Sequence, residues 1–128
     1  MSEPIVFTSR HKIKQEKLDE FKPVFVDGLA AIEDDKPSTI FQYAYVNSNW
    51  TEVSFVHIFP NADAFEHHLI GVDDRAKKGY EFIEPMSMEK YGSPGEKILQ
   101  MFKQIEAGGV SFTLWPETLG DFTRLSEA

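Results

Sequence analysis

The chain changes from strand to helix within residues 53–69, which read VSFVHIFPNADAFEHHL. Side chains in the first half alternate with the period of two that is typical of a strand, and we predict a strand over residues 51–59. Pro60 and Asn61 interrupt this pattern, and Asn61 is of a residue type that caps the N-terminus of helices. A helix is therefore expected over about residues 62–70, and residues 73–79 could add a further helical turn.

Two strands and a helix are predicted on the N-terminal side of this stretch. Residues 39–47 are rich in aromatic and β-branched side chains, and the short segment 48–50 joins them to residues 51–59 as a hairpin. Residues 5–13 also alternate with the period of a strand. Between residues 5–13 and 39–47, apolar side chains recur at spacings of three and four, which predicts one amphipathic helix carrying Leu18, Phe21, Phe25, Leu29 and Ile32.

On the C-terminal side we predict a strand, a helix and a last strand. Residues 83–91 form the first of these strands. Ser93 is a suitable N-cap for the helix, which carries Phe102 on its apolar face and ends at Gly108. Residues 110–115 form the last strand, and a tail with scattered apolar groups follows it.

The predicted order is β-α-β-β-α-β followed by one more helix and strand. This is the α+β, ferredoxin-like split βαβ plan with an antiparallel sheet and a C-terminal helix-strand extension. We expect one domain over residues 1–128, with its core at 5–91 and the extension at 92–128. Because most strands have apolar residues on both faces, the face without helices must be covered. We predict that a second copy of the chain covers it in a homodimer.

Composition excludes several classes of function. The chain of 128 residues has 13 basic and 21 acidic side chains, a formal net charge of −8, which argues against binding nucleic acid or an anionic membrane. It has no cysteine, so disulfides, thiolate metal sites and thiol nucleophiles are excluded. No window has the roughly 18 apolar residues of a membrane span, and no signal peptide is recognisable. We expect a cytoplasmic protein.

Histidine supplies the candidate catalytic groups. His57 shares a strand face with aromatic side chains, and His68 borders the apolar face of the predicted helix, whereas His67 points to solvent. A buried histidine is commonly structural; the alternative is a group that orients or deprotonates a ligand. The sequence has no metal-binding motif and no glycine-rich phosphate or dinucleotide loop, so we predict neither a metal nor a cofactor.

Residues 53–69 resemble the antibiotic biosynthesis monooxygenase family. That family shows a strand ending in an aromatic residue, a polar turn, an alanine-containing helix start and a His-Leu pair, here His68 and Leu69. The resemblance covers roughly residues 5–91 and implies a dimeric α+β barrel. His68 falls where the helix histidine of the family stands, whereas His57 stands where Glu is common and Phe59 where Trp is common. Another branch of the same superfamily degrades haem, and its characteristic residues are not retained at the matching positions Ser9, His68 and Lys78. The resemblance therefore argues against haem degradation.

Two functions follow from the resemblance and the residues. The first is a cofactor-independent monooxygenase that acts on a small aromatic or quinol-like substrate, with His57 and His68 as its acid–base groups. The second is a non-catalytic barrel that binds a small molecule. In both, the ligand is expected in an apolar pocket lined by Phe7, Phe55, Phe59, Phe65 and Tyr43.

Overall fold

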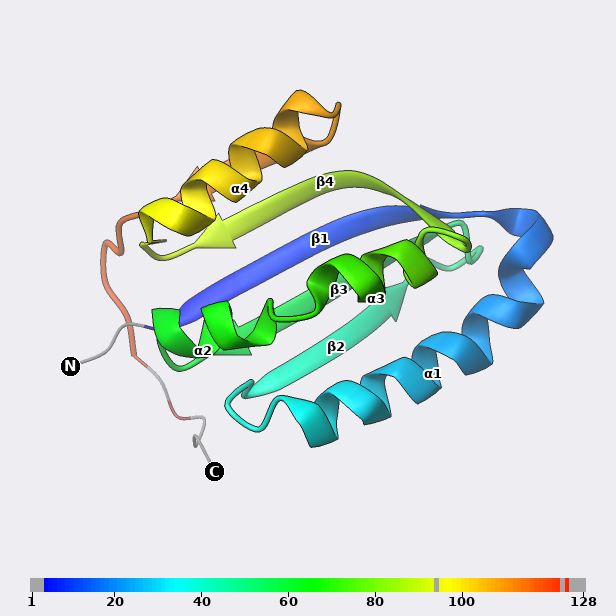
Figure 1. The fold of residues 1–128 in the computed structure, drawn as a ribbon, viewed down its shortest axis with the longest axis horizontal. Helices are drawn as coiled ribbons and strands as arrows, with labels where there is room; N and C mark the ends of the chain where they lie inside the picture. Colours follow the sequence, from blue (N-terminus) through cyan, green and yellow to red (C-terminus); the bar gives the residue numbers. More distant parts are fainter. Residues whose placement is uncertain (1–3, 94, 123, 125–128) are drawn as a thin grey trace.

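The computed structural model describes residues 4–93, 95–122 and 124. Its centre is a five-stranded sheet in the order β2-β3-β1-β4-β5 (Figure 1). The strands are β1 (Ile5–Ile13), β2 (Phe41–Val46), β3 (Glu52–Phe59), β4 (Ile83–Tyr91) and β5 (Ser111–Trp115). The order of β1 to β4 is that of the ferredoxin-like plan, which confirms the predicted fold class.

The four α-helices of the described residues lie on one side of the sheet (Figure 1). They are α1 (Leu18–Asp35), α2 (Ala62–His68), α3 (Val72–Gly79) and α4 (Glu96–Ala107), with a short 3₁₀ turn, Gln15–Lys17, before α1. Asn61 caps α2 as predicted, because its side-chain oxygen accepts the Ala64 N–H at 2.8 Å. Within the described residues, no helix has both the length and the apolar character needed to cross a membrane.

The extension differs from the prediction in two respects. Strand β5 pairs with β4 in parallel, so the sheet is mixed and only its β1–β4 part is antiparallel. The reason is that α4 forms a crossover, which returns the chain in its original direction. Helix α4 begins at Glu96 with Gly95 at its N-cap, rather than after Ser93; Pro94 lies outside the described residues.

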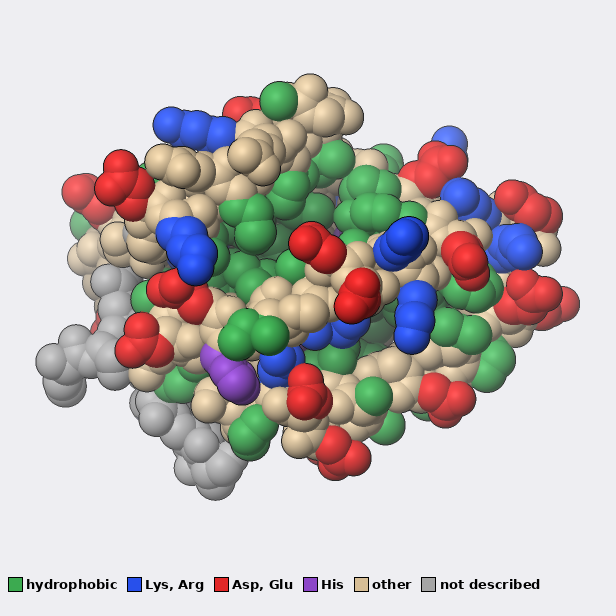
Figure 2. Space-filling view, viewed as in Figure 1, with side chains coloured by type: hydrophobic (Ala, Val, Ile, Leu, Met, Phe, Trp, Pro, Cys, Tyr) green, Lys and Arg blue, Asp and Glu red, His purple; other side chains and the backbone are tan. Residues whose placement is uncertain are grey.

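Two hydrophobic clusters fill the space between sheet and helices. One is centred on Phe59 and Phe65 and includes Phe102 of α4. The other is centred on Phe21 and Phe55. On the surface of the helix side, hydrophobic side chains gather in a hollow between α4 and the α2–α3 pair (Figure 2). Helix α4 is therefore part of the core and not an appendage.

The opposite face of the sheet carries no helix of the described residues. Its aromatic side chains are exposed at 52% for Tyr43, 56% for Tyr45 and 52% for Trp115. Phe41, Tyr43 and Tyr45 form a row along β2, with ring centroids 4.8 and 5.8 Å apart. Exposed aromatic groups in such a row are typical of a surface that another molecule covers.

The contribution of the extension can be tested at Phe102. This side chain is 2% exposed, and its ring lies 5.5 Å from that of Phe7 and 4.4 Å from that of Phe112. We expect Phe102→Ala to reduce the free energy of unfolding by about 3–5 kcal/mol, as measured by urea denaturation. The neighbouring Lys103→Ala, at an exposed position of the same helix, should change it by less than about 0.5 kcal/mol. Similar values for the two variants would show that α4 does not stabilise the core.

Candidate functional site

His57 lies on the helix side of β3, opposite Phe7 of β1 and Gln42 of β2. Its side chain is 8% exposed. The Nδ1 atom is 3.2 Å from the Phe7 carbonyl oxygen. Because a carbonyl only accepts, Nδ1 carries the hydrogen, and Nε2 is left with the free lone pair. Burial lowers the pKa of His57 to about 4, so the ring is neutral at neutral pH.

His68 comes from the last turn of α2 and is 5% exposed. Its Nδ1 atom lies 2.8 Å from the Thr39 hydroxyl. Its ring meets that of His57 edge to face, with centroids 5.2 Å apart and an interplanar angle of 74°. Burial is the main cause that lowers the pKa of His68 to about 3, and His57 adds to it. The structure thus brings the two predicted histidines together as a pair of neutral imidazoles.

Two cations hold the end of α2 next to this pair. Arg75 Nη2 donates to the His68 carbonyl oxygen at 2.6 Å. Lys36 Nζ donates to the His67 carbonyl oxygen at 3.0 Å and lies 3.4 Å from the Asp35 carboxylate. These bonds satisfy carbonyl groups that the helix end leaves without partners. Both positive charges also lower the pKa of His68 further.

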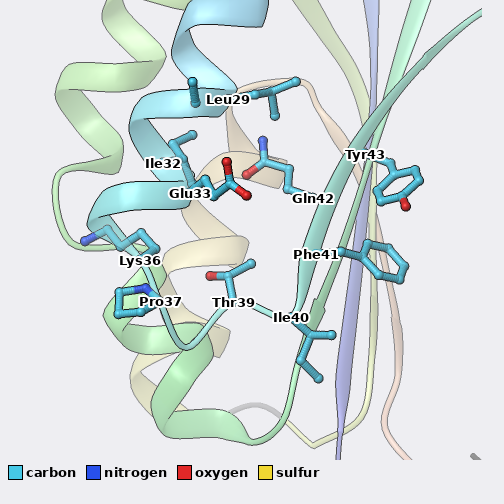
Figure 3. Close-up of a pocket in the computed structure, with 11 residues that line it drawn as sticks. Leu29, Ile32, Glu33, Lys36, Pro37, Thr39, Ile40, Phe41, Gln42 and Tyr43 are labelled. Atoms are coloured by element: carbon cyan, nitrogen blue, oxygen red, sulfur yellow. The ribbon is translucent and has the colours of Figure 1, made fainter. Parts of the chain in front are cut away.

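A cavity of about 500 Å³ lies between the C-terminal half of α1 and strand β2 (Figure 3). Its volume is within the range of small-molecule sites. Thr39 lines the cavity and also contacts His68, so it links the cavity to the histidine pair. The complete lining is Leu29, Ala30, Ile32, Glu33, Lys36, Pro37, Thr39, Ile40, Phe41, Gln42 and Tyr43.

Most of the aromatic residues predicted to line a pocket are packed inside the protein. Phe59 and Phe65 belong to one hydrophobic cluster, Phe7 packs against it, and Phe55 belongs to the other cluster. None of these four contributes to the lining of the α1–β2 cavity. Tyr43 does, although its ring extends from the opposite side of β2 (Figure 3).

Sequence reasoning missed Thr39 and Gln42 as site residues. A single Thr or Gln in a strand has many structural roles, and no motif marks either position. The alternation of a strand puts Gln42 on the face opposite Phe41 and Tyr43, but it does not reveal that helix α1 leaves space above Gln42. His67 is exposed, as its helical angle predicted. Within the described part of the chain, no three His, Asp or Glu side chains are grouped so as to hold a metal ion.

Comparisons with known proteins place the fold. No protein-family model matches the sequence, and no curated protein matches it. Among solved structures, SnoaB, a cofactor-independent oxygenase from Streptomyces nogalater, matches with a TM-score of 0.59 and 16% identity over 72% of this chain and 94% of that one. A protein of Caulobacter crescentus CB15 grouped with the antibiotic biosynthesis monooxygenases matches with a TM-score of 0.61 and 17% identity, over 70% and 88%. The chain has the fold of the antibiotic biosynthesis monooxygenases.

The extension also has a counterpart. MupZ from Pseudomonas fluorescens matches with a TM-score of 0.72 and 14% identity over 97% of this chain and 91% of that one. A match of that extent includes helix α4 and strand β5, which lie outside the 5–91 region of the predicted resemblance. The resemblance inferred from residues 53–69 is therefore confirmed for the fold, and the fold with its extension occurs in another protein.

The low histidine pKa values make stability depend on pH. Unfolded histidine titrates near pH 6.5, whereas folded His57 titrates near 4. Between these values unfolding takes up a proton, so stability falls as the pH decreases. Burial lowers the pKa of His11 to about 4 as well, and His68 adds to the same effect. We expect the free energy of unfolding, measured with urea, to decrease steadily from pH 7 to pH 5.

The contribution of His57 can be separated from overall stability through the slope of this pH dependence. In the His57→Gln variant, unfolding below pH 6 should take up as much as one proton fewer. The slope of the free energy of unfolding against pH should therefore decrease by up to about 1.4 kcal/mol per pH unit. His67→Gln is the matched control, because this side chain is exposed, and it should leave the slope unchanged. An unaltered slope in the His57 variant would mean that this ring is not held neutral by the fold.

Proposed function

We propose that the protein is a cofactor-independent monooxygenase whose small aromatic substrate binds in the α1–β2 cavity. The observation that carries the proposal is the pair of buried, neutral imidazoles, His57 and His68, connected to this cavity through Thr39. SnoaB, which has the same fold, is a cofactor-independent oxygenase. At 16% identity, this similarity shows that the two proteins share a fold. The oxygenase activity of this chain is our proposal.

In the proposed reaction the substrate itself reduces dioxygen. An electron-rich hydroxyarene or anthrone loses a proton and gives four electrons to O₂. One oxygen atom becomes a new C–O group of the product and the other leaves as water. In an anthrone, this converts the CH₂ carbon to C=O. The protein has to exclude water, orient the substrate and accept a proton. We assign two proton acceptors. One is His68, which acts through the Thr39 hydroxyl, and the other is the unprotonated Nε2 of His57.

Oxygen uptake tests this function directly. The purified protein is assayed with a panel of hydroquinones and anthrones, and uptake should depend on both protein and substrate. His57→Ala or His68→Ala should then reduce the rate by roughly 100-fold or more, the range of a general base. His67→Ala is the control and should retain full activity. Full activity in the His57→Ala, His68→Ala double variant would remove the histidine pair from the mechanism.

A second candidate function is ligand binding without catalysis, and one observation favours it. A base works best when its pKa is near the working pH, whereas the pKa values of His57 and His68 are about 4 and about 3. Neutral imidazoles of this kind are good hydrogen-bond acceptors but weak bases. Saturable ligand binding without any oxygen uptake across the panel would support this second function.

We also propose that the protein acts as a homodimer through the sheet face that carries no helices. Support comes from the exposed row of Tyr43 and Tyr45 and from Trp115, whose ring is stacked on Tyr91. A cavity of about 170 Å³ lies on this face among polar residues that include Arg10 and Glu89. Covering these aromatic groups in an interface would be favourable, because it removes apolar surface from water.

The dimer can be tested by light scattering at micromolar concentration. The wild-type protein should scatter as twice 14.6 kDa. Tyr45→Glu places a charge in the proposed interface and should shift the mass to that of a monomer. Val26→Glu, at a position of α1 that is 66% exposed, is the control and should remain dimeric. A wild-type particle of 14.6 kDa would contradict the proposal.

A further inference from the structure

One part of the wall of the α1–β2 cavity is aliphatic, and the rest of the lining carries polar or aromatic side chains. Leu29 and Ile32 project from α1, and Pro37 and Ile40 come from the segment that leads into β2 (Figure 3). None of these four side chains donates or accepts a hydrogen bond. The part of a ligand that lies against these four side chains should therefore be apolar, because burying polar groups there would cost free energy without any compensating bond.

One residue of the lining carries a buried acceptor. Gln42 lies on the helix side of β2, next to His57 of β3, and its side chain extends toward α1 (Figure 3). Its Oε1 atom is buried, and among the described residues it has no hydrogen-bond partner. A buried amide oxygen without a partner is costly and uncommon in native proteins. A ligand group that donates a hydrogen bond would remove this cost.

The charges around the cavity select against anions. The Lys36 ammonium points away from the cavity (Figure 3), and it is bound to the His67 carbonyl and the Asp35 carboxylate. The Glu33 carboxylate, by contrast, is turned toward the same space as Gln42 (Figure 3). A ligand carboxylate would meet an acceptor and a negative charge, with no available cation among the lining residues.

We propose that the α1–β2 cavity binds a small, uncharged, largely apolar molecule through a hydroxyl group that donates to Gln42 Oε1. Gln42 is then the residue that determines specificity: it selects a hydroxyl over the corresponding ether and over a carboxylate. The inference names the substrate class for the site of the proposed oxygenase and in that sense rests on the proposed function. Binding nevertheless has its own test, which requires no turnover.

Equilibrium dialysis of the wild-type protein at pH 7 with three naphthalene probes tests the ligand class. The probes are 1-naphthol, 1-methoxynaphthalene and 1-naphthoate, which share one ring system. The first offers a donor, the second has the donor methylated and the third is an anion. We expect saturable binding of 1-naphthol, binding of 1-methoxynaphthalene that is weaker by about 10-fold or more, and weaker binding still of 1-naphthoate.

Variants locate the binding. Gln42→Leu removes the acceptor at nearly constant volume, so it should lower the affinity for 1-naphthol by about 10-fold and abolish the preference for the hydroxyl over the ether. Gln104→Leu, at an exposed position of α4, is the matched control and should leave both affinities unchanged. Leu29→Trp fills the cavity from α1 and should prevent binding of both probes. Circular dichroism confirms that each variant is folded.

Three outcomes of the binding experiments would contradict the proposed ligand class. Absence of saturable 1-naphthol binding, equal affinity for the hydroxyl and the ether, or binding that survives Leu29→Trp would overturn the inference. Preferential binding of 1-naphthol that depends on Gln42 but is accompanied by no oxygen uptake with any hydroxyarene would leave the inference standing and reject the proposed oxygenase.

Discussion

The pairing of β1 with β3 is the constraint on which the site depends. In this register Ile5 lies opposite Phe59 and Phe7 opposite His57, so all four side chains face the helices. A slip of one residue would reverse the faces of β3 and move His57 to the side without helices. The same register brings the Phe7 carbonyl to His57 Nδ1, which sets the tautomer of the ring. Strand pairing therefore fixes both the position of this imidazole and its free lone pair.

Burial then determines the chemistry of the histidine pair. Desolvation is the largest cause that lowers the pKa of both His57 and His68, and Arg75 lowers both further. Arg75 is held at this place because it binds the carbonyl end of α2. One side chain thus stabilises a helix end and keeps the neighbouring rings uncharged. The result is a pair of buried imidazoles that are uncharged at neutral pH.

The cavity arises from unequal packing along α1. In the first half of the helix, Phe25 fills the space above the sheet, with its ring 5.7 Å from that of Phe55 and 6.2 Å from that of Phe82. In the second half, Leu29 and Ile32 lie across from Gln42 on β2 and are only partly buried. Smaller side chains on both sides leave a volume that neither the helix nor the strand fills. An opening of this kind is where a ligand can replace missing packing.

The sequence by itself determined the order of the elements, the fold class and the inward position of the two histidines. Each of these follows from local periodicity: a period of two for β3 and of about 3.6 for α1 and α2. The sequence did not determine that β5 joins in parallel, that four predicted pocket phenylalanines lie in the packed core, or that Thr39 and Gln42 line a cavity. The direction of β5 depends on the crossover through α4, and the packed phenylalanines and the cavity depend on how closely α1 and α4 approach the sheet. Only the tertiary structure decides that distance, because it results from the summed volumes of side chains far apart in the chain.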